Sequence, residues 1–175
     1  KVVIVSGIGP GLGQELSTLA AKEGASAVVL AARTQAKLDV AEQEIRALGL
    51  GTAVLKVATD IADQGQCQAL ADRAVQEYGR IDVLFNSAYD PGSFEPIEEA
   101  SMDGWRRAMD VNFFGTMHLT QACVRHMKNS GGGAIVMIAT MVEHKPLATQ
   151  AGYGSSKSAL RCATKHLALE LEKYN

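Results

Sequence analysis

Two residues near the end of the chain, Tyr153 and Lys157, have the types and the spacing of a proton-transfer pair. Residues four apart on a helix lie on one face, about 6 Å apart along its axis. A phenol is a weak acid at neutral pH, and a nearby ammonium group stabilises its phenolate form. The pair is therefore suited to giving a proton to a substrate bound against this face. Alone, the spacing is weak evidence, because solvated helix faces often carry it.

A glycine-rich segment at the start of the chain provides the context that the pair needs. The run from Lys1 to Ser6 is short, β-branched and apolar, as expected of a strand buried on both faces of a parallel sheet. It leads into Gly7-Ile8-Gly9-Pro10-Gly11-Leu12-Gly13 and then into a helical segment over 14–23. Glycines let the backbone approach a pyrophosphate, which the N–H groups of a helix N-terminus bind. The segment predicts a dinucleotide site; a tight turn without a ligand is the alternative.

The residues after the second predicted strand, 27–32, bear on which dinucleotide is bound. Dinucleotide folds place an acidic residue there for the ribose 2′-hydroxyl of NAD, or an arginine that accommodates the 2′-phosphate of NADP. Here Ala32 replaces the carboxylate, and Arg33 and Thr34 follow it. We therefore expect NADP (NADPH) to be preferred over NAD. The alternative is that Arg33 is only a solvated residue at the start of a helix for which Thr34 is the N-cap.

The rest of the chain alternates between strand and helix patterns. Further strands are expected at 53–58, 81–85 and 134–139, and further helices at 34–48, 63–78, 102–128 and 153–173. This alternation predicts one α/β domain over residues 1–175, a three-layer α/β/α protein with a Rossmann-type, doubly wound parallel sheet. Ligands bind such sheets at the carboxyl ends of the strands. Asp60, which follows the third strand, is placed to reach an adenine edge or to act as an ordinary loop residue.

The composition excludes several other classes of protein. The chain has 175 residues, of which 47% are hydrophobic and 21% charged, with a formal net charge of −2. It contains no Lys/Arg-rich block of the kind that binds nucleic acid, and no apolar run of the roughly 18–20 residues that a membrane span requires. Its three cysteines are scattered, which favours a reducing, cytoplasmic location. Neither the cysteines nor the histidines have metal-ligand spacing, so no metal site is expected.

Taken together, these landmarks resemble the short-chain dehydrogenase/reductase family, in its single-domain, NAD(P)-dependent branch. The resemblance extends over essentially the whole chain and rests on motifs in the family's order and spacing. These are Ser6-Gly7-x-x-x-Gly11-x-Gly13, Asp60-Ile61, Asn86-Ser87-Ala88, Val111-Asn112 and Tyr153-x-x-x-Lys157, with Thr140 at the position of the family's catalytic Ser.

The resemblance implies a role for each of these residues. Tyr153 would exchange a proton with the substrate oxygen, Thr140 would hydrogen-bond that oxygen, and Lys157 would assist Tyr153 and bind the nicotinamide ribose. Asn112 would position a water that links Lys157 to solvent. The implied cofactor-binding residues are Ser6, Gly7, Gly9, Gly11, Leu12, Gly13, Arg33, Thr34, Asp60, Ile61, Asn86, Ser87, Ala88, Val111, Tyr153 and Lys157.

The function implied is hydride transfer between NADP(H) and a small-molecule carbonyl or secondary alcohol. An NAD-preferring secondary alcohol dehydrogenase and a non-catalytic nucleotide-binding redox sensor are the alternatives. The resemblance also implies a homo-oligomer, a dimer or a tetramer. Apolar positions around Phe113 and on the face of the last helix fit this, although they also fit an intrachain core. The family continues beyond the point where this chain ends, so we expect the chain to be part of a longer polypeptide.

Three residues depart from the family's pattern. Thr140 keeps the hydroxyl of the family's Ser but adds a methyl group that restricts its rotamers. Tyr89 stands where the family has Gly, and it places a ring beside the cofactor ribose. Pro10 removes one N–H group from the phosphate loop. The departures at Thr140 and Tyr89 are the ones that favour the non-catalytic alternative.

Overall fold

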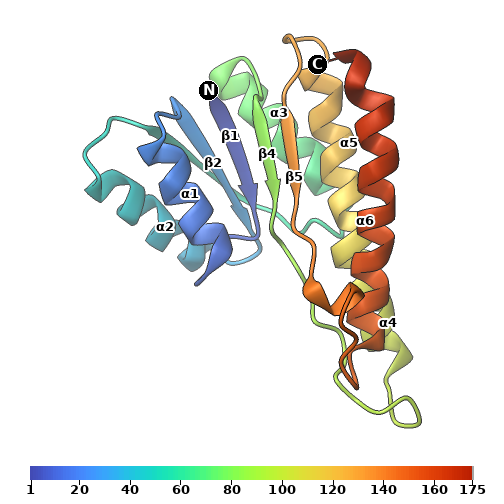
Figure 1. Ribbon diagram of the computed structural model, residues 1–175. Coiled ribbons are helices and arrows are strands. Elements are labelled where there is room, and N and C mark those ends of the chain that lie inside the picture. The colour runs from blue at the N-terminus through green and yellow to red at the C-terminus, as the bar shows by residue number, and fades with distance from the viewer. Residues whose placement is uncertain (175) are drawn as a thin grey trace.

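The computed structural model describes residues 1–174, which are built around a five-stranded parallel sheet (Figure 1). The strands lie in the order β3-β2-β1-β4-β5. Val29 of β2 lies opposite Ile4 of β1, Ile4 lies opposite Leu84 of β4, and Leu84 lies opposite Ile135 of β5. The strands are β1 (Val2–Ser6), β2 (Ala27–Ala32), β3 (Ala53–Ala58), β4 (Val83–Asn86) and β5 (Ala134–Met137). The predicted Rossmann-type fold is confirmed.

Helices cover both faces of this sheet and bury a separate apolar cluster on each face. On one face α1 (Leu12–Lys22) and α2 (Gln35–Ala47) pack together and cover a cluster centred on Val5 and Leu30. On the other face α3 (Gln64–Tyr78) packs against α5 (Thr116–Met127) over a cluster that includes Ile4 and Leu84. The helix α6 (Ala151–Leu171) runs beside α5 (Figure 1) and packs against β5 and α4 (Met102–Met109).

The strand order creates a crevice at the carboxyl ends of β1 and β4. The chain builds β1, β2 and β3 outward in one direction and then returns to place β4 on the other side of β1. Connections at such a switch point lead away in opposite directions, which opens a ligand crevice between them. Ser6 and Asn86, the last residues of the two strands, lie opposite each other at its floor.

The long helix expected over 102–128 is interrupted. Between α4 and α5 the backbone forms a π-helical segment, η1 (Asp110–Gly115). Its wider turn places Asn112 in the interior, with no exposed surface. A Cβ atom at Gly115 would lie 2.9 Å from the carbonyl oxygen of Ile61, so only glycine lets η1 approach the loop after β3 so closely. Such segments are frequent at functional sites.

The other element boundaries agree with the sequence-based expectations to within about three residues. A short 3₁₀ turn, η2 (Met141–Glu143), had not been expected; it follows β5 and precedes α6. The chain ends in a second 3₁₀ turn, η3 (Glu172–Tyr174). Within residues 1–174, no helix is both long and apolar enough to cross a bilayer.

Candidate active site

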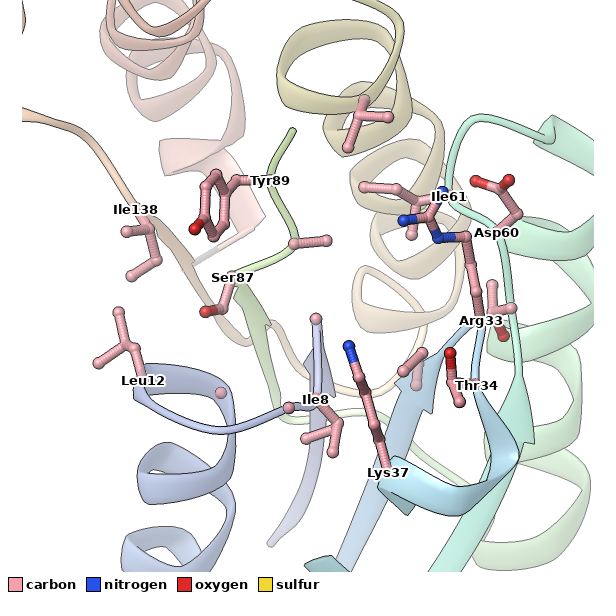
Figure 2. Close-up of a pocket in the computed structure, with 18 of the residues that line it drawn as sticks. Ile8, Leu12, Arg33, Thr34, Lys37, Asp60, Ile61, Ser87, Tyr89 and Ile138 are labelled. Atoms are coloured by element: carbon pink, nitrogen blue, oxygen red, sulfur yellow. The ribbon is translucent and has the colours of Figure 1, made fainter. Parts of the chain in front are cut away.

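A single pocket lies in the crevice and gathers most of the predicted site residues (Figure 2). It runs from the glycine loop and the start of α2 to the N-terminal part of α6. The predicted residues that line it are Gly7, Gly9, Leu12, Gly13, Arg33, Thr34, Asp60, Ile61, Ser87, Ala88, Val111, Tyr153 and Lys157. Residues far apart in the sequence therefore meet on one surface, at the edge of the sheet where a ligand was expected.

The glycine loop is shaped by contacts that exclude side chains. Gly7 has a φ of +85°, and a Cβ atom there would lie 2.3 Å from the backbone nitrogen of Ala88. A Cβ atom at Gly13 would lie 2.2 Å from the carbonyl oxygen of Gly7. At the N-cap of α1, Gly11 has no side chain to accept from the first-turn N–H groups. Leu12 and Gly13, the first two residues of α1, line the pocket, so this helix N-terminus and its glycine loop fit a pyrophosphate.

Two cationic side chains stand at the end of the pocket beside β2 and α2. Arg33 follows β2 directly, and Lys37 lies in the first turn of α2. Figure 2 shows Arg33 turned towards Ile61 and Asp60, and Lys37 directed towards the glycine loop at Ile8. Within the described residues neither cation has a carboxylate within ion-pair distance. This end of the pocket therefore offers two exposed, uncompensated positive charges.

Thr34 and Asp60 complete this end. Thr34 stands at the N-cap position of α2, as predicted, but its side chain makes no capping hydrogen bond. Its hydroxyl group is therefore available to the pocket. The Asp60 carboxylate accepts a hydrogen bond from the Ala62 N–H at 3.0 Å, which orders the loop after β3. Both the adenine and the loop interpretations of Asp60 agree with this position.

At the opposite end, Tyr153 and Lys157 line the pocket from the first two turns of α6. Lys157 is 3% exposed, and its Nζ atom donates to the carbonyl oxygen of Ile138 at 2.8 Å. Burial lowers the pKa of Lys157 to about 8, while the negative charge of Glu143 acts in the opposite direction. With that value the side chain remains mainly an ammonium group at neutral pH. The cation thus lies one helical turn from Tyr153, in the same pocket.

Asn112 does not line the pocket, but it ties three segments together beneath it. Its Oδ1 atom accepts from the Asp90 N–H, and its Nδ2 atom donates to the Asp90 carbonyl oxygen, both at 2.8 Å. Nδ2 also donates to the Ser156 hydroxyl at 2.9 Å. These bonds join η1, the loop after β4 and α6. The expected water between Asn112 and Lys157 stays a prediction.

Four other predicted residues lie at the edge of the pocket without lining it. The Ser6 hydroxyl donates to the Phe85 carbonyl oxygen at 3.3 Å, and Gly11 forms the N-cap of α1. The buried Asn86 amide donates to Thr120 Oγ1 at 3.1 Å, and its own Oδ1 atom has no hydrogen-bond partner within the described chain. Thr140 accepts from the Val142 N–H at 3.4 Å. That contact leaves the Thr140 O–H free to donate to a substrate.

Several residues that line the pocket were not predicted as site residues, and Lys37 and Ile138 are among them. Lys37 follows Arg33 by four positions, and its place in the first helical turn was the signal that could have revealed it. Ile138 lies just past the end of β5, and it contributes its carbonyl group to Lys157. Every residue has a backbone carbonyl group, so the residue type at position 138 does not indicate this contact.

Tyr89 replaces a glycine of the family pattern and does enter the pocket (Figure 2). Its ring lies edge-on to the ring of Tyr153, with the ring centroids 6.4 Å apart and an angle of 68° between the planes. Its neighbours in Figure 2 are Ser87 and Ile138. Tyr89 therefore narrows the same end of the pocket that holds the phenol and the ammonium group.

Comparison with known proteins agrees with this geometry. Over residues 1–175 the chain matches the family model described as short chain dehydrogenase. The chain belongs to this family. It is 36% identical over 173 residues to an uncharacterized oxidoreductase of Methylorubrum extorquens, a match that covers 98% of this chain and 67% of that protein. It is 34% identical over 175 residues to the 7alpha-hydroxysteroid dehydrogenase of Escherichia coli K12, a match that covers 100% of this chain and 67% of that protein.

Solved structures give the same result. An NAD⁺-bound xylitol dehydrogenase superposes with a TM-score of 0.95 at 31% identity, covering 100% of this chain and 66% of that one. A 7α-hydroxysteroid dehydrogenase complexed with NADH and 7-oxo glycochenodeoxycholic acid gives a TM-score of 0.92 at 31% identity, covering 100% and 67%. The chain thus spans about two thirds of the length of these relatives. At the level of the family, the predicted class of NAD(P)-dependent oxidoreductase acting on CH–OH and C=O groups is confirmed.

Proposed function

We propose that this chain is the NAD(P)-binding domain of an NADPH-dependent oxidoreductase that interconverts a small-molecule carbonyl compound and its alcohol. The observation that supports this most directly is the continuity of the pocket. One surface joins a glycine loop, a pair of free cations and the Tyr153–Lys157 pair. A dinucleotide that follows this surface would extend from the cations towards the phenol.

The preference for NADPH rests on Arg33 and Lys37. The two solved structures named above contain NAD⁺ and NADH, so they do not support this preference. The residue before Arg33 is Ala32, which cannot accept hydrogen bonds from a ribose 2′-hydroxyl as a carboxylate does. Two uncompensated cations beside Thr34 instead match a phosphate group.

The side chains at the other end have the groups that proton transfer needs. When bound, the nicotinamide supplies or accepts the hydride. The Tyr153 hydroxyl gives its proton to the carbonyl oxygen during reduction and recovers it during oxidation. The buried ammonium group of Lys157 stabilises the phenolate that remains. The free O–H of Thr140 donates to the same substrate oxygen and orients it.

Asn112 has a positioning role in this proposal. Its paired bonds to the Asp90 backbone set the path of the segment that carries Tyr89, and its bond to Ser156 fixes the turn of α6 between Tyr153 and Lys157. Since Nδ2 already donates to two partners, its remaining acceptor capacity and its backbone carbonyl are the groups that would hold a water next to Lys157.

We also propose a homo-oligomer. Phe114 in η1 is 49% exposed, and Leu169 in α6 is 76% exposed. Single exposed apolar side chains are ordinary on a protein surface, so the resemblance to the family carries this proposal, and Phe114 and Leu169 are side chains that such an interface would cover.

The cofactor preference can be tested with substitutions on the two cations. The dissociation constants of NADPH and NADH would be measured by fluorescence titration for the full-length protein, Arg33→Gln and Lys37→Gln. We expect each substitution to weaken NADPH binding by about tenfold, roughly 1.4 kcal/mol, and NADH binding by less than about threefold. Arg46→Gln is the control. Arg46 lies on α2, as Lys37 does, but it forms an ion pair with Glu42 at 2.8 Å and does not line the pocket.

The selective loss of NADPH affinity is the informative result. If both cofactors weaken equally in the Arg33 and Lys37 variants, the cations do not recognise the 2′-phosphate. If the unmodified protein binds NADH more tightly than NADPH, the alternative of an NAD-preferring dehydrogenase replaces this proposal.

A further inference from the structure

The η2 turn buries a carboxylate that the mechanism above does not use. Glu143 lies between Thr140 and Tyr153 in the sequence, and its side chain is only 4% exposed. Its Oε2 atom is buried and has no hydrogen-bond partner among residues 1–174. An ionised carboxylate in such a position is costly unless a nearby positive charge compensates it.

The compensating charges lie on one face of α6. Tyr153, Lys157 and Arg161 follow one another at intervals of four residues, so their side chains form one row along the helix. Arg161 Nη1 lies 3.8 Å from Glu143 Oε2. The two cations are thus neighbours of like charge, and Glu143 approaches their row from η2.

We infer that Glu143 is a positioning residue for the reaction, whose buried carboxylate keeps the Lys157 ammonium group charged beside Tyr153. The effect of Glu143 on the reaction rests on the proposed function, in which Lys157 stabilises the Tyr153 phenolate. Lys157 is almost completely buried, and in the described part of the chain its side chain makes one hydrogen bond, to the neutral carbonyl of Ile138. Burial without a counter-charge favours the neutral amine, which could not stabilise a phenolate.

The effect of Glu143 on Lys157 is electrostatic. Burial is the larger influence and lowers the pKa of Lys157, and the Glu143 charge is the opposing one that raises it. On α6 itself the ionisable neighbours are Tyr153 and Arg161. The elements packed against α6 are α4, η1, η2, η3 and β5, and their ionisable residues other than Glu143 are Asp103, Arg106, Arg107, Asp110, Glu172, Lys173 and Tyr174. Among all these groups, only Glu143 is a source of the Lys157 shift besides burial.

Arg161 allows a second, opposite change in the Lys157 pKa to be tested. It attracts the Glu143 carboxylate and, as a cation one turn away, repels the charge on Lys157. By Coulomb's law, removing the carboxylate and removing the guanidinium group should shift the Lys157 pKa in opposite directions, the second by the smaller amount because the Arg161 side chain is 42% exposed and screened by solvent. A merely structural contact between η2 and α6 would not produce that pattern.

The test is a direct titration of Lys157 in the full-length protein by NMR of ¹³C-labelled lysine, with the signal assigned by its absence in Lys157→Met. In Glu143→Gln the Lys157 pKa should fall by at least about half a unit, and in Arg161→Gln it should rise. Glu143→Asp, which retains the charge, should lie closer to the unmodified protein than Glu143→Gln does. Glu170→Gln removes an exposed carboxylate from the same helix and should leave the pKa unchanged.

The second readout is the pH dependence of kcat for carbonyl reduction with NADPH. In Glu143→Gln the decline of kcat at alkaline pH should begin at a lower pH, by the shift seen in the titration, while Glu170→Gln follows the unmodified protein. An unshifted Lys157 pKa in Glu143→Gln, or shifts of the same sign in the Glu143 and Arg161 variants, overturns the inference. A shifted pKa with an unmoved kcat profile overturns its link to catalysis.

The titration needs no turnover, so it separates this inference from the proposed function. If the unmodified protein reduces no carbonyl compound, the proposed function fails while the pKa shifts still decide the role of Glu143. If Glu143→Gln does not fold, Arg161→Gln alone decides, because a Lys157 pKa that stays level or falls in that variant contradicts the charge arrangement.

Discussion

Substituting alanine for Gly13 tests the contact that shapes the phosphate loop. A Cβ atom at Gly13 would lie 2.2 Å from the Gly7 carbonyl oxygen and 2.9 Å from the carbonyl carbon. The first distance is about 1 Å shorter than van der Waals radii allow, and both atoms belong to the backbone, which cannot rotate away. Helix propensity favours alanine by about 1 kcal/mol, whereas overpacking of this kind costs about 1–3 kcal/mol or more.

We therefore expect Gly13→Ala to lower the free energy of unfolding by about 2 kcal/mol, because the backbone clash exceeds the gain in propensity. In urea this is a shift of about 1 M in the midpoint, for an m-value near 2 kcal/mol/M. NADPH affinity should fall as well, since the clash displaces the backbone that lines the pyrophosphate site.

Gly65→Ala is the matched control. Gly65 is the second residue of α3, as Gly13 is of α1, but its Cβ atom would meet only the Asp63 carboxylate, at 3.2 Å. Its free energy of unfolding should stay within about 1 kcal/mol of the unmodified protein, and its NADPH affinity should not change. If Gly13→Ala proves as stable as Gly65→Ala and binds NADPH normally, the reasoning about the loop is refuted.

Three further predictions concern buried polar groups. Asn112→Ala should lower the free energy of unfolding by about 1–3 kcal/mol, because it leaves buried backbone groups without partners; an unchanged urea midpoint would contradict this. The folded-state pKa of Lys157, about 8, lies below its ordinary value of 10.5, so burying the charged side chain lowers the free energy of unfolding. This loss of stability is complete below pH 8 and disappears as the pH rises to 10.5. The stability of the unmodified protein relative to Lys157→Met should thus rise by about 3 kcal/mol over this range, and a flat difference in urea titrations would contradict the burial of the charge. Burial raises the pKa of the Cys67 thiol to about 12 and raises that of Cys123 as well, so iodoacetamide at pH 7.5 should label only the exposed Cys162, as mass spectrometry of the folded protein would show. Rapid labelling of Cys67 or Cys123 would contradict the packing of α3 against α5.

The elements of this fold were predictable where the signal is local. The five strands are short apolar runs bounded by turns, and each appears within about three residues of its expected position. The glycine loop was recognisable because a strand, three spaced glycines and a helix follow one another directly in the sequence. The position of the pocket was predictable from the topology, because the carboxyl ends of parallel strands lie at the same edge of the sheet and ligands bind there.

What the sequence did not reveal depends on contacts between distant segments. The π-helical segment is one case, because an apolar residue every fourth position from Trp105 to Met117 is equally compatible with an unbroken α-helix. It ends at Gly115, which approaches Ile61 too closely for any side chain, and no local pattern encodes that contact. Glu143 is another case: as a charged residue in a loop it would ordinarily be exposed, and only the folded chain buries it against α6.

The central claim is that Tyr153 transfers a proton in a reaction that uses NADPH. The most direct test compares the full-length protein with Tyr153→Phe, following NADPH absorbance with a panel of ketones and aldehydes and measuring NADPH binding separately. We expect the variant to bind NADPH with an affinity within about threefold of the unmodified protein while kcat falls by a factor of at least about 10³. Substantial turnover in Tyr153→Phe would contradict the claim.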